Sequence, residues 1–250
     1  MKILLRISLS IAAIVAAFIS LFGCASVQRK LLYFPSHLEL SNQLTPWFHH
    51  HEIIGYTREV PAPKNVWLML HGNGGQAAHR ASALPYFSAD DSVFVLEYPG
   101  YGLRAGTPSM TAINAAARAA YDLLREKFPN TPICVLGESL GTGPACTLAI
   151  HPNPPQKIVL IVPYDELAKV AAEHYPFLPV RLMLNDNWNN LTALANYCGP
   201  LEIYAEKFDT VIPISHARAL AASRPQAVFH ELIGGHNDWT LDLTIKIQNP

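Results

Sequence analysis

Most of the chain alternates between two hydrophobic patterns, short apolar runs and longer segments with apolar residues at helical spacing. The short runs, several of them unbroken stretches of β-branched and aliphatic residues, are typical of strands covered on both faces. They span residues 53–60, 66–70, 93–97, 133–136, 157–162, 201–205 and 227–232. The clearest helical segment is the alanine-rich residues 110–128, which follow Ser109 as a predicted N-cap and end before Pro129. This alternation predicts an α/β fold with a mostly parallel central sheet and helices on both faces.

Two segments do not follow the alternation. Residues 28–51 form a polar and aromatic lead-in, to which we assign no strand or helix. Residues 163–200 are too long for a plain connection, and we expect a short lid-like excursion over the carboxyl edge of the sheet. Its apolar side chains would either line a pocket or form a small satellite core. They are Tyr164, Tyr175, Phe177, Leu178, Val180, Leu182, Met183, Leu184 and Trp188.

The N-terminus has the order of a secretory signal: the basic residues Lys2 and Arg6 come first, a mostly apolar stretch over residues 7–22 follows, and Gly23-Cys24 comes directly after it. Residues 21–24 resemble the lipobox of bacterial lipoproteins, whose cysteine sulfur receives a diacylglyceryl group. We therefore expect a lipoprotein signal peptide over residues 1–23 and one mature domain over residues 24–250, anchored to a membrane of the bacterial cell envelope through lipidated Cys24. The alternatives are an uncleaved anchor helix over about residues 3–22 and plain secretion.

Composition excludes several classes of protein. Half of the 250 residues are hydrophobic and only 15% are charged, which excludes intrinsic disorder. The net charge is −1 and no basic run exceeds Arg29-Lys30, so nucleic acid is not an expected partner. Four cysteines without CxxC spacing argue against a zinc site or a disulfide scaffold, and Cys134 and Cys146 are expected in the core.

The strongest chemical signal is the sequence Gly137-Glu138-Ser139-Leu140-Gly141, which lies between a predicted strand and a predicted helix. A sharp strand-to-helix turn holds its central residue in a strained backbone conformation, and glycines on both sides remove side chains that would collide there. Ser139 is therefore the candidate nucleophile.

A serine hydroxyl needs a base, and the base needs a carboxylate that orients it. Asp209 follows the predicted strand 201–205, and His236 follows the predicted strand 227–232. Sites in open α/β sheets form at the carboxyl ends of strands. The order Ser139, Asp209, His236 is the order in which α/β-hydrolases carry their triad.

Other acids and histidines compete for these roles. Asp186 and Asp238 are alternative acids, and His216 and His230 are weaker candidates for the base because they fall within predicted elements, where either could be a surface residue. The run His49-His50-His51 lacks accompanying metal ligands and is interpreted as a solvated segment.

The oxyanion hole requires two backbone N–H groups. One would come from Leu140, the residue after the nucleophile, and the second from Asn73 in the glycine-rich turn His71-Gly72-Asn73-Gly74-Gly75 that follows strand 66–70. His71 is interpreted as a side chain that fixes this loop. No Gly-Lys-Ser/Thr follows, which argues against a phosphate loop.

These motifs resemble the Bem46-like group of the α/β-hydrolase serine hydrolases, which includes the ABHD12, ABHD13 and ABHD17 hydrolases. Residues 71–75 with Arg80 resemble its HGN loop, residues 97–109 its YxGYGxSxGxPS segment, and residues 137–145 its GESLGTGPA elbow. With the lead-in 31–35, the resemblance covers about residues 31–243. It departs at Arg104, where the group usually has serine, and at residues 205–208, which replace a small glycine-containing turn.

The resemblance implies the α/β-hydrolase fold and a Ser-His-Asp hydrolase of ester, thioester or related acyl substrates. It implies no metal or organic cofactor, a small-molecule or lipid-like substrate, and frequent association with membranes. His236 would accept the Ser139 proton, Ser139 would form an acyl-enzyme, and Asp209 would hold the imidazolium. The alternatives are a serine peptidase or amidase on the same fold, a noncatalytic lipid-anchored binding protein on a hydrolase scaffold, and a structural envelope lipoprotein.

Overall fold

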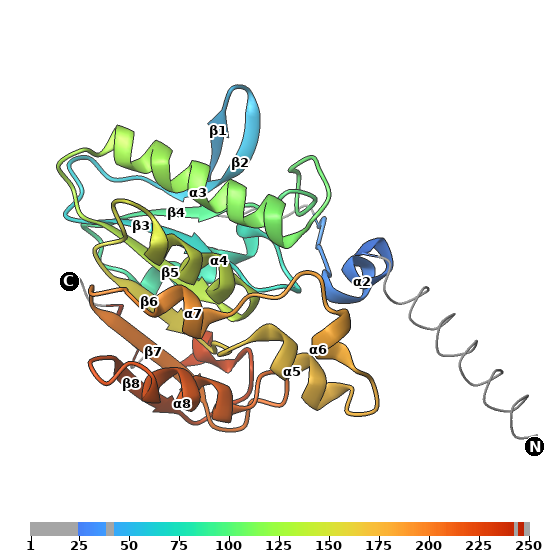
Figure 1. Cartoon of the computed structure of the whole chain (residues 1–250). Coiled ribbons are helices and arrows are strands. Elements are labelled where there is room, and N and C mark those ends of the chain that lie inside the picture. The colour runs from blue at the N-terminus through green and yellow to red at the C-terminus, as the bar shows by residue number, and fades with distance from the viewer. Residues whose placement is uncertain (1–24, 39–42, 243–244, 248–250) are drawn as a thin grey trace, which may run out of the picture.

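A single twisted sheet organises the molecule (Figure 1). The computed structural model describes residues 25–38, 43–242 and 245–247, so the expected signal peptide and Cys24 lie outside the described residues. Within them the sheet has eight strands in the order β1-β2-β4-β3-β5-β6-β7-β8. The strands are β1 (Thr45–His49), β2 (Glu52–Arg58), β3 (Val66–Leu70), β4 (Ser92–Leu96), β5 (Ile133–Glu138), β6 (Ile158–Ile161), β7 (Leu201–Glu206) and β8 (Val228–Leu232). From β4 to β8 all neighbours are parallel, while β2 is antiparallel to both β1 and β4.

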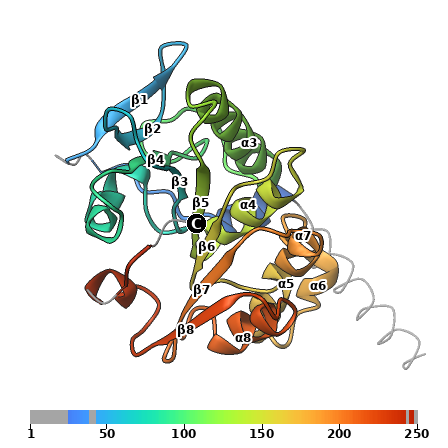
Figure 2. The same cartoon turned by 90° about the vertical axis from the view of Figure 1, so that its left-hand side faces the viewer.

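Helices cover the two faces unequally. The α-helices are α2 (Ala25–Leu32), α3 (Met110–Lys127), α4 (Thr142–Thr147), α5 (Leu167–His174), α6 (Val180–Met183), α7 (Asn190–Leu194) and α8 (Ile214–Ala222). The 3₁₀ helices are η1 (Ala77–Tyr86), η2 (Ser139–Gly141), η3 (Leu148–Ile150) and η4 (Asp238–Leu241). Figure 2 shows α3, α4 and α7 on one side of the sheet, with the chain of η1 and η4 on the other. In the described part of the chain, no helix is both long and apolar enough to cross a bilayer.

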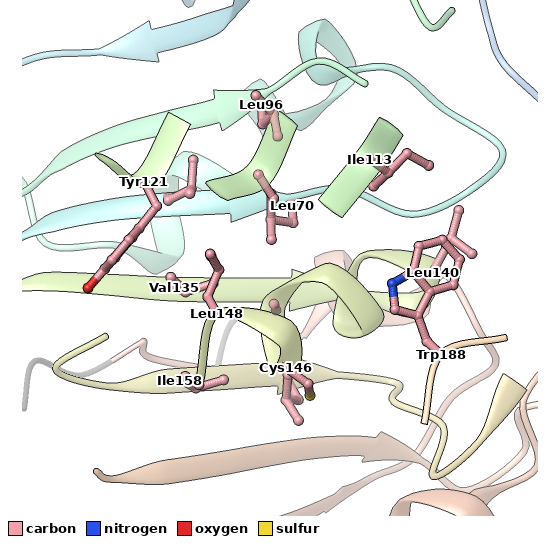
Figure 3. Packing of buried hydrophobic residues seen from close by; sticks show 14 of the residues in the cluster. Leu70, Leu96, Ile113, Tyr121, Val135, Leu140, Cys146, Leu148, Ile158 and Trp188 are labelled. Atoms are coloured by element: carbon pink, nitrogen blue, oxygen red, sulfur yellow. The ribbon is translucent and has the colours of Figure 1, made fainter. Parts of the chain in front are cut away.

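The core has two layers because neighbouring strand residues point to opposite faces. Leu68 and Leu70 of β3 pack with α3 and α4 on one face, whereas Trp67 and Met69 pack with η1 on the other. Figure 3 shows the first layer, in which strand residues such as Leu70 and Val135 belong to the same core cluster as Ile113 of α3 and Cys146 of α4. Both faces of the sheet are thus buried, which explains why the central strands are unbroken apolar runs in the sequence.

The predicted mostly parallel sheet with helices on both faces is confirmed, and each predicted strand is present to within a few residues. Helix α3 begins at Met110, and its N-cap Ser109 accepts a hydrogen bond from the Ala112 N–H at 3.1 Å. Cys134 and Cys146 are buried, as predicted.

The interpretation of residues 28–51 as a lead-in without elements is wrong. The segment contains α2 and the edge strand β1, which pairs with β2 through a turn at His50 and His51. Strand β1 is mostly exposed and contains Pro46, so it lacks the apolar alternation that reveals a strand in sequence.

Helix α2 is attached to the body at the carboxyl edge of the sheet. The carboxylate of Asp186 accepts hydrogen bonds from Arg29 Nε at 3.1 Å, from the Tyr33 hydroxyl at 2.9 Å and from the Met110 N–H at 3.2 Å. Asp186 is buried, so this charge-assisted contact fixes the N-terminal segment against the loops around Ser139.

Candidate active site

Ser139 lies at a turn that admits almost no side chains around it. It follows β5 directly, has a backbone φ of +51° and is the first residue of η2, which leads into α4. A Cβ at Gly141 would lie 2.1 Å from the Leu70 carbonyl oxygen, and one at Gly137 would lie 2.6 Å from the Gly141 carbonyl oxygen. The elbow therefore packs backbone against backbone, and both flanking positions require glycine.

The three predicted triad residues form a continuous series of hydrogen bonds. Ser139 Oγ is 2.9 Å from His236 Nε2, and His236 Nδ1 is 2.6 Å from Asp209 Oδ2. An ionised carboxylate can only accept, so the ring proton lies on Nδ1 and leaves Nε2 free to accept from the serine hydroxyl. This is the tautomer that a general base requires.

The loops that carry Asp209 and His236 are joined by a continuation of the sheet. Beyond the ends of β7 and β8, the Lys207 N–H donates to the Leu232 carbonyl at 2.9 Å and the Phe208 N–H donates to the Gly234 carbonyl at 2.9 Å. Residues 205–208, which depart from the family pattern, thus extend the strand pairing. The second oxygen of Asp209 accepts the Val211 and Ile212 N–H groups, each at 2.8 Å. The acid is therefore oriented by backbone on one side and by the imidazole on the other.

Glu206 is a further carboxyl group beneath these loops that sequence reasoning did not assign. It is buried at the end of β7, and its Oε2 has no hydrogen-bond partner among the described residues. Burial raises the pKa of Glu206 to about 7, and the nearby carboxylates of Asp238, Asp242 and Asp209 add to the effect. Below that pH the group is neutral and does not place a second negative charge beside the Asp209–His236 pair.

The competing acids are held elsewhere. Asp186 fixes α2, and Asp238 Oδ2 accepts from the Gly235 N–H at 2.7 Å rather than from an imidazole. His216 is buried, and its Nδ1 lies 2.8 Å from the carboxylate of Asp165 in the connection between β6 and α5. His230 Nε2 lies 2.8 Å from Glu202 at the opposite edge of the sheet.

The histidine run ends β1 and forms the hairpin turn, with His50 and His51 exposed. Within the residues that the structure covers, no three His, Cys, Asp or Glu side chains are grouped as metal ligands.

The glycine-rich loop after β3 passes close to Ser139 and is braced from several sides. A Cβ at Gly72 would lie 3.4 Å from Ser139 Cβ. The Asn73 amide oxygen accepts from the Tyr101 hydroxyl at 2.8 Å and from the Phe34 N–H at 3.1 Å, and its nitrogen donates to the Leu32 carbonyl at 2.6 Å. With its side chain engaged in this way, Asn73 presents its main chain to the pocket.

Two buried groups hold the rest of this loop. His71 lies against the Gly72 carbonyl at 2.7 Å and the Glu97 carboxylate at 3.2 Å, so both ring nitrogens are engaged within the loop, in agreement with its predicted fixing role. The Tyr98 hydroxyl donates to the His71 carbonyl at 2.8 Å. Burial raises the pKa of Tyr98 and Tyr101, which keeps both hydroxyls available as donors.

Arg80 and Glu138 form an ion pair beside the serine, to which sequence reasoning assigned no role. Arg80 Nε and Nη2 donate to the two Glu138 oxygens at 2.6 and 3.0 Å, and the Trp239 indole N–H donates to Glu138 Oε1 at 3.4 Å. This bidentate pair joins η1 and η4 to the elbow and neutralises both charges. The signal in the sequence is a carboxylate inside an otherwise uncharged turn.

Ser139, His236, Leu140 and Asn73 all line one cavity of about 640 Å³. Its walls differ in chemistry. The apolar lining comes from α2 and the segment after it, from α5 and from the loop over residues 207–213 that carries Asp209, here called the acid loop. These residues are Leu31, Leu32, Phe34, Leu167, Val170, Ala171, Val211 and Ile212. The polar lining comes mainly from the β3 loop, the elbow, η1 and the region of η4: Gly74, Arg80, Ser82, Glu138, Asn237 and Thr240.

The segment 163–200 contributes to this cavity, but through different residues from those named in sequence. Of the predicted apolar side chains whose placement the structure describes, only Tyr164 lines it. Phe177 is 97% exposed, and Trp188 is buried against α4 with its indole donating to Asn114 at 2.8 Å. The reason is that α5 begins soon after β6, so its first turns face the cavity and the later apolar residues lie beyond it.

Comparison with known proteins identifies the family of the chain. Residues 65–196 match the family model described as alpha/beta hydrolase fold. The uncharacterized protein Rv2307c of Mycobacterium tuberculosis is 31% identical over 253 residues, which cover 92% of this chain and 87% of that protein.

A more distant relative is named as a lipase, and a protein of similar fold is named as an esterase. The lysophosphatidylserine lipase ABHD12 of Danio rerio is 26% identical over 66% of this chain and 48% of its own length. The esterase Pf2001 of Pyrococcus furiosus has a similar structure, with a TM-score of 0.63 at 15% identity, covering 82% of this chain and 91% of that one. At that identity the likeness concerns the fold alone.

The packing of the elbow predicts that substitution of two glycines by alanine has very different effects on the free energy of unfolding. Gly141→Ala should lower the free energy of unfolding by about 3 kcal/mol or more, because the new Cβ would collide with the backbone of β3. Gly74→Ala is the matched control and should change it by less than about 0.5 kcal/mol, since nothing lies within 4 Å of that position. Urea denaturation measures both; equal effects would contradict the described packing.

Proposed function

The chain belongs to the α/β-hydrolase fold family, and on that basis we propose that it is a serine hydrolase that cleaves ester or thioester bonds of acyl substrates. The observation that carries this proposal is the continuous hydrogen-bonded series from Ser139 through His236 to Asp209, of which Ser139 and His236 line a cavity. The esterases and lipases among similar proteins support the reaction class.

The geometry accounts for each step of such a reaction. His236 Nε2 takes the proton from Ser139 Oγ as the oxygen attacks the substrate carbonyl, and Asp209 stabilises the imidazolium that forms. When the tetrahedral intermediate collapses, the leaving alcohol or thiol takes that proton, and the acyl group stays on Ser139. A water molecule, deprotonated by His236, then releases the acid.

The negative charge that develops on the carbonyl oxygen requires backbone donors. We assign these to the N–H groups of Leu140 and Asn73, both of which line the cavity with Ser139. The hydroxyl of Tyr101 and the backbone of Phe34 and Leu32 hold Asn73 in place, so the donor is positioned before the substrate arrives. Pre-orientation of this kind lowers the barrier because no reorganisation is needed during the reaction.

The two kinds of lining suggest how an acyl substrate is placed. Val170 of α5, Leu31 and Ile212 offer an apolar wall for the acyl chain, and Ser82 and Thr240 offer polar contacts for the leaving group. A cavity of about 640 Å³ is of the size that holds small organic ligands. A lipophilic acyl ester fits this arrangement better than a peptide, which would place polar amides along the apolar wall.

The location of the protein is a separate proposal that rests on sequence. We propose that residues 1–23 are a lipoprotein signal and that Cys24 carries the lipid anchor in the cell envelope. Metabolic labelling with a fatty acid should mark the wild-type protein and not Cys24→Ser. Label retained in the variant would favour an uncleaved anchor helix.

Replacing the nucleophile should abolish the activity without unfolding the protein. Ser139→Ala is expected to eliminate esterase turnover and labelling by a fluorophosphonate probe, because it removes the attacking oxygen but little buried area. Ser82→Ala, a serine that lines the same cavity, is the matched control and should be labelled normally. A wild-type protein that is neither labelled nor active would favour a noncatalytic binding protein instead.

The acid should show the effect of a wrong imidazole tautomer. Asp209→Asn keeps the shape but offers an amide, and by analogy with serine proteases it should lower kcat on the order of 10⁴-fold. Asp238→Asn should have far less effect, because that carboxylate accepts a hydrogen bond from the Gly235 N–H and none from the His236 imidazole. The reverse ranking would show that Asp209 is not the catalytic acid.

The apolar wall predicts a dependence on acyl length. For p-nitrophenyl esters, kcat/KM should rise as the chain lengthens from about two to about eight carbons, with each buried methylene contributing up to ~0.8 kcal/mol. A flat profile would exclude the lipophilic-acyl proposal while leaving the hydrolase intact. Faster cleavage of a peptide amide than of any ester would favour a peptidase or amidase.

A further inference from the structure

Exposed large apolar side chains are concentrated at the edge of the sheet that carries Ser139. Among the described residues, the large hydrophobic residues with exposed side chains lie on the N-terminal segment 25–38, on loops beyond the carboxyl ends of the parallel strands or at the end of η4, except Phe48, Ile150 and Val228. Exposed apolar residues on a soluble surface are ordinarily scattered singly. Their restriction to one edge marks that edge as a contact surface.

The pocket opens within this apolar rim. Leu31, Phe34 and Val211 both line the cavity and are exposed, at 61%, 58% and 48%. Phe177, in the loop between α5 and α6, is 97% exposed and does not line the cavity. Figure 1 shows α2, α5 and α6 together at this end of the molecule. The rim thus extends outward from the pocket walls onto the surrounding surface.

The part of the rim formed by α2 follows the apolar N-terminal sequence along the chain. The stretch over residues 7–22 ends just before α2, which begins at Ala25 and supplies Leu31 and Leu32 to the pocket. Asp186 fixes α2 through Arg29, so the first described helix after the apolar sequence is attached to the body with its last turn in the pocket wall. A tether at this point, whether lipid or helix, holds the rim close to the membrane that contains it.

The charges of the rim are mixed. Lys30, Arg181 and Lys207 are exposed there, but so are Glu173 and Asp238. The surface is therefore suited to apolar contact rather than to electrostatic attraction. A protein seated on it would cover the mouth through which substrate reaches Ser139, whereas a bilayer would supply an acyl substrate at that mouth.

We propose that the apolar rim around the pocket, from α2 through Phe34 to the α5–α6 loop and the acid loop, rests on a lipid bilayer and admits substrate directly from it. The orientation stands on the distribution of exposed residues and the position of the N-terminal sequence. The entry of substrate rests in addition on the proposed function.

Fluorescence quenching tests the orientation without any activity. In the full chain bound to vesicles, Phe177→Trp should add a tryptophan signal that dibromo-phosphatidylcholine quenches relative to unbrominated phosphatidylcholine. Phe48→Trp, on the hairpin turn side of β1, should add an unquenched signal. The same result is expected in a Ser139→Ala background, so it stands even if the proposed hydrolase activity is wrong. Equal quenching at both positions, or none at Phe177→Trp, would overturn the orientation.

Kinetics tests substrate entry. Phe177→Ser should raise KM roughly tenfold for a long-chain ester presented in phosphatidylcholine vesicles, since the loss of one inserted aromatic side chain weakens contact by about that factor. Its kcat/KM for a soluble short-chain ester should stay unchanged, and Phe48→Ser should change neither. Equal effects on both esters would overturn entry from the bilayer. A dimer that becomes a monomer on Phe177→Ser would identify a second copy as the occupant and also overturn the proposal.

Discussion

The close approach of the turn after β5 to the end of β3 is the constraint on which the site depends. Because Gly141 lies directly against the Leu70 carbonyl, Ser139 is held in a left-handed conformation, and its hydroxyl lies 2.9 Å from His236 Nε2. The same approach brings the glycine-rich loop after β3 beside the serine. One packing contact therefore places both the candidate nucleophile and the candidate oxyanion loop.

The other half of the site uses the sheet differently. The acid and the histidine come from neighbouring parallel strands, and pairing between β7 and β8 continues through Lys207 and Phe208 into the loops. Backbone hydrogen bonds thereby set the separation of Asp209 and His236, and the side chains need only complete the contact. Backbone hydrogen bonds between strands make such a site rigid without additional interactions, because the buried backbone N–H and C=O groups need hydrogen-bond partners in any case.

The polar and apolar surfaces of the pocket come from different layers of the fold. Arg80 and Trp239 belong to the side covered by η1 and η4, and Leu167 and Val170 belong to the side covered by the α-helices. The pocket forms where these layers meet at the carboxyl edge of the sheet. The N-terminal segment then adds Leu31 and Phe34, which extend the apolar wall to the exposed rim.

The sequence by itself determined what depends on local pattern. The strands, α3 with its Ser109 cap, and the positions of Ser139, Asp209 and His236 follow from apolar runs and the residues that end them, since parallel strands bring their carboxyl ends to one edge. Tertiary structure decided what depends on distant contacts. Strand β1 exists because β2 offers an edge, His216 is buried because Asp165 faces it, and the pocket is lined by Leu31 and Leu167, which lie far apart in the chain. No local pattern records such pairings, because their free energy arises only when the chain has brought the partners together.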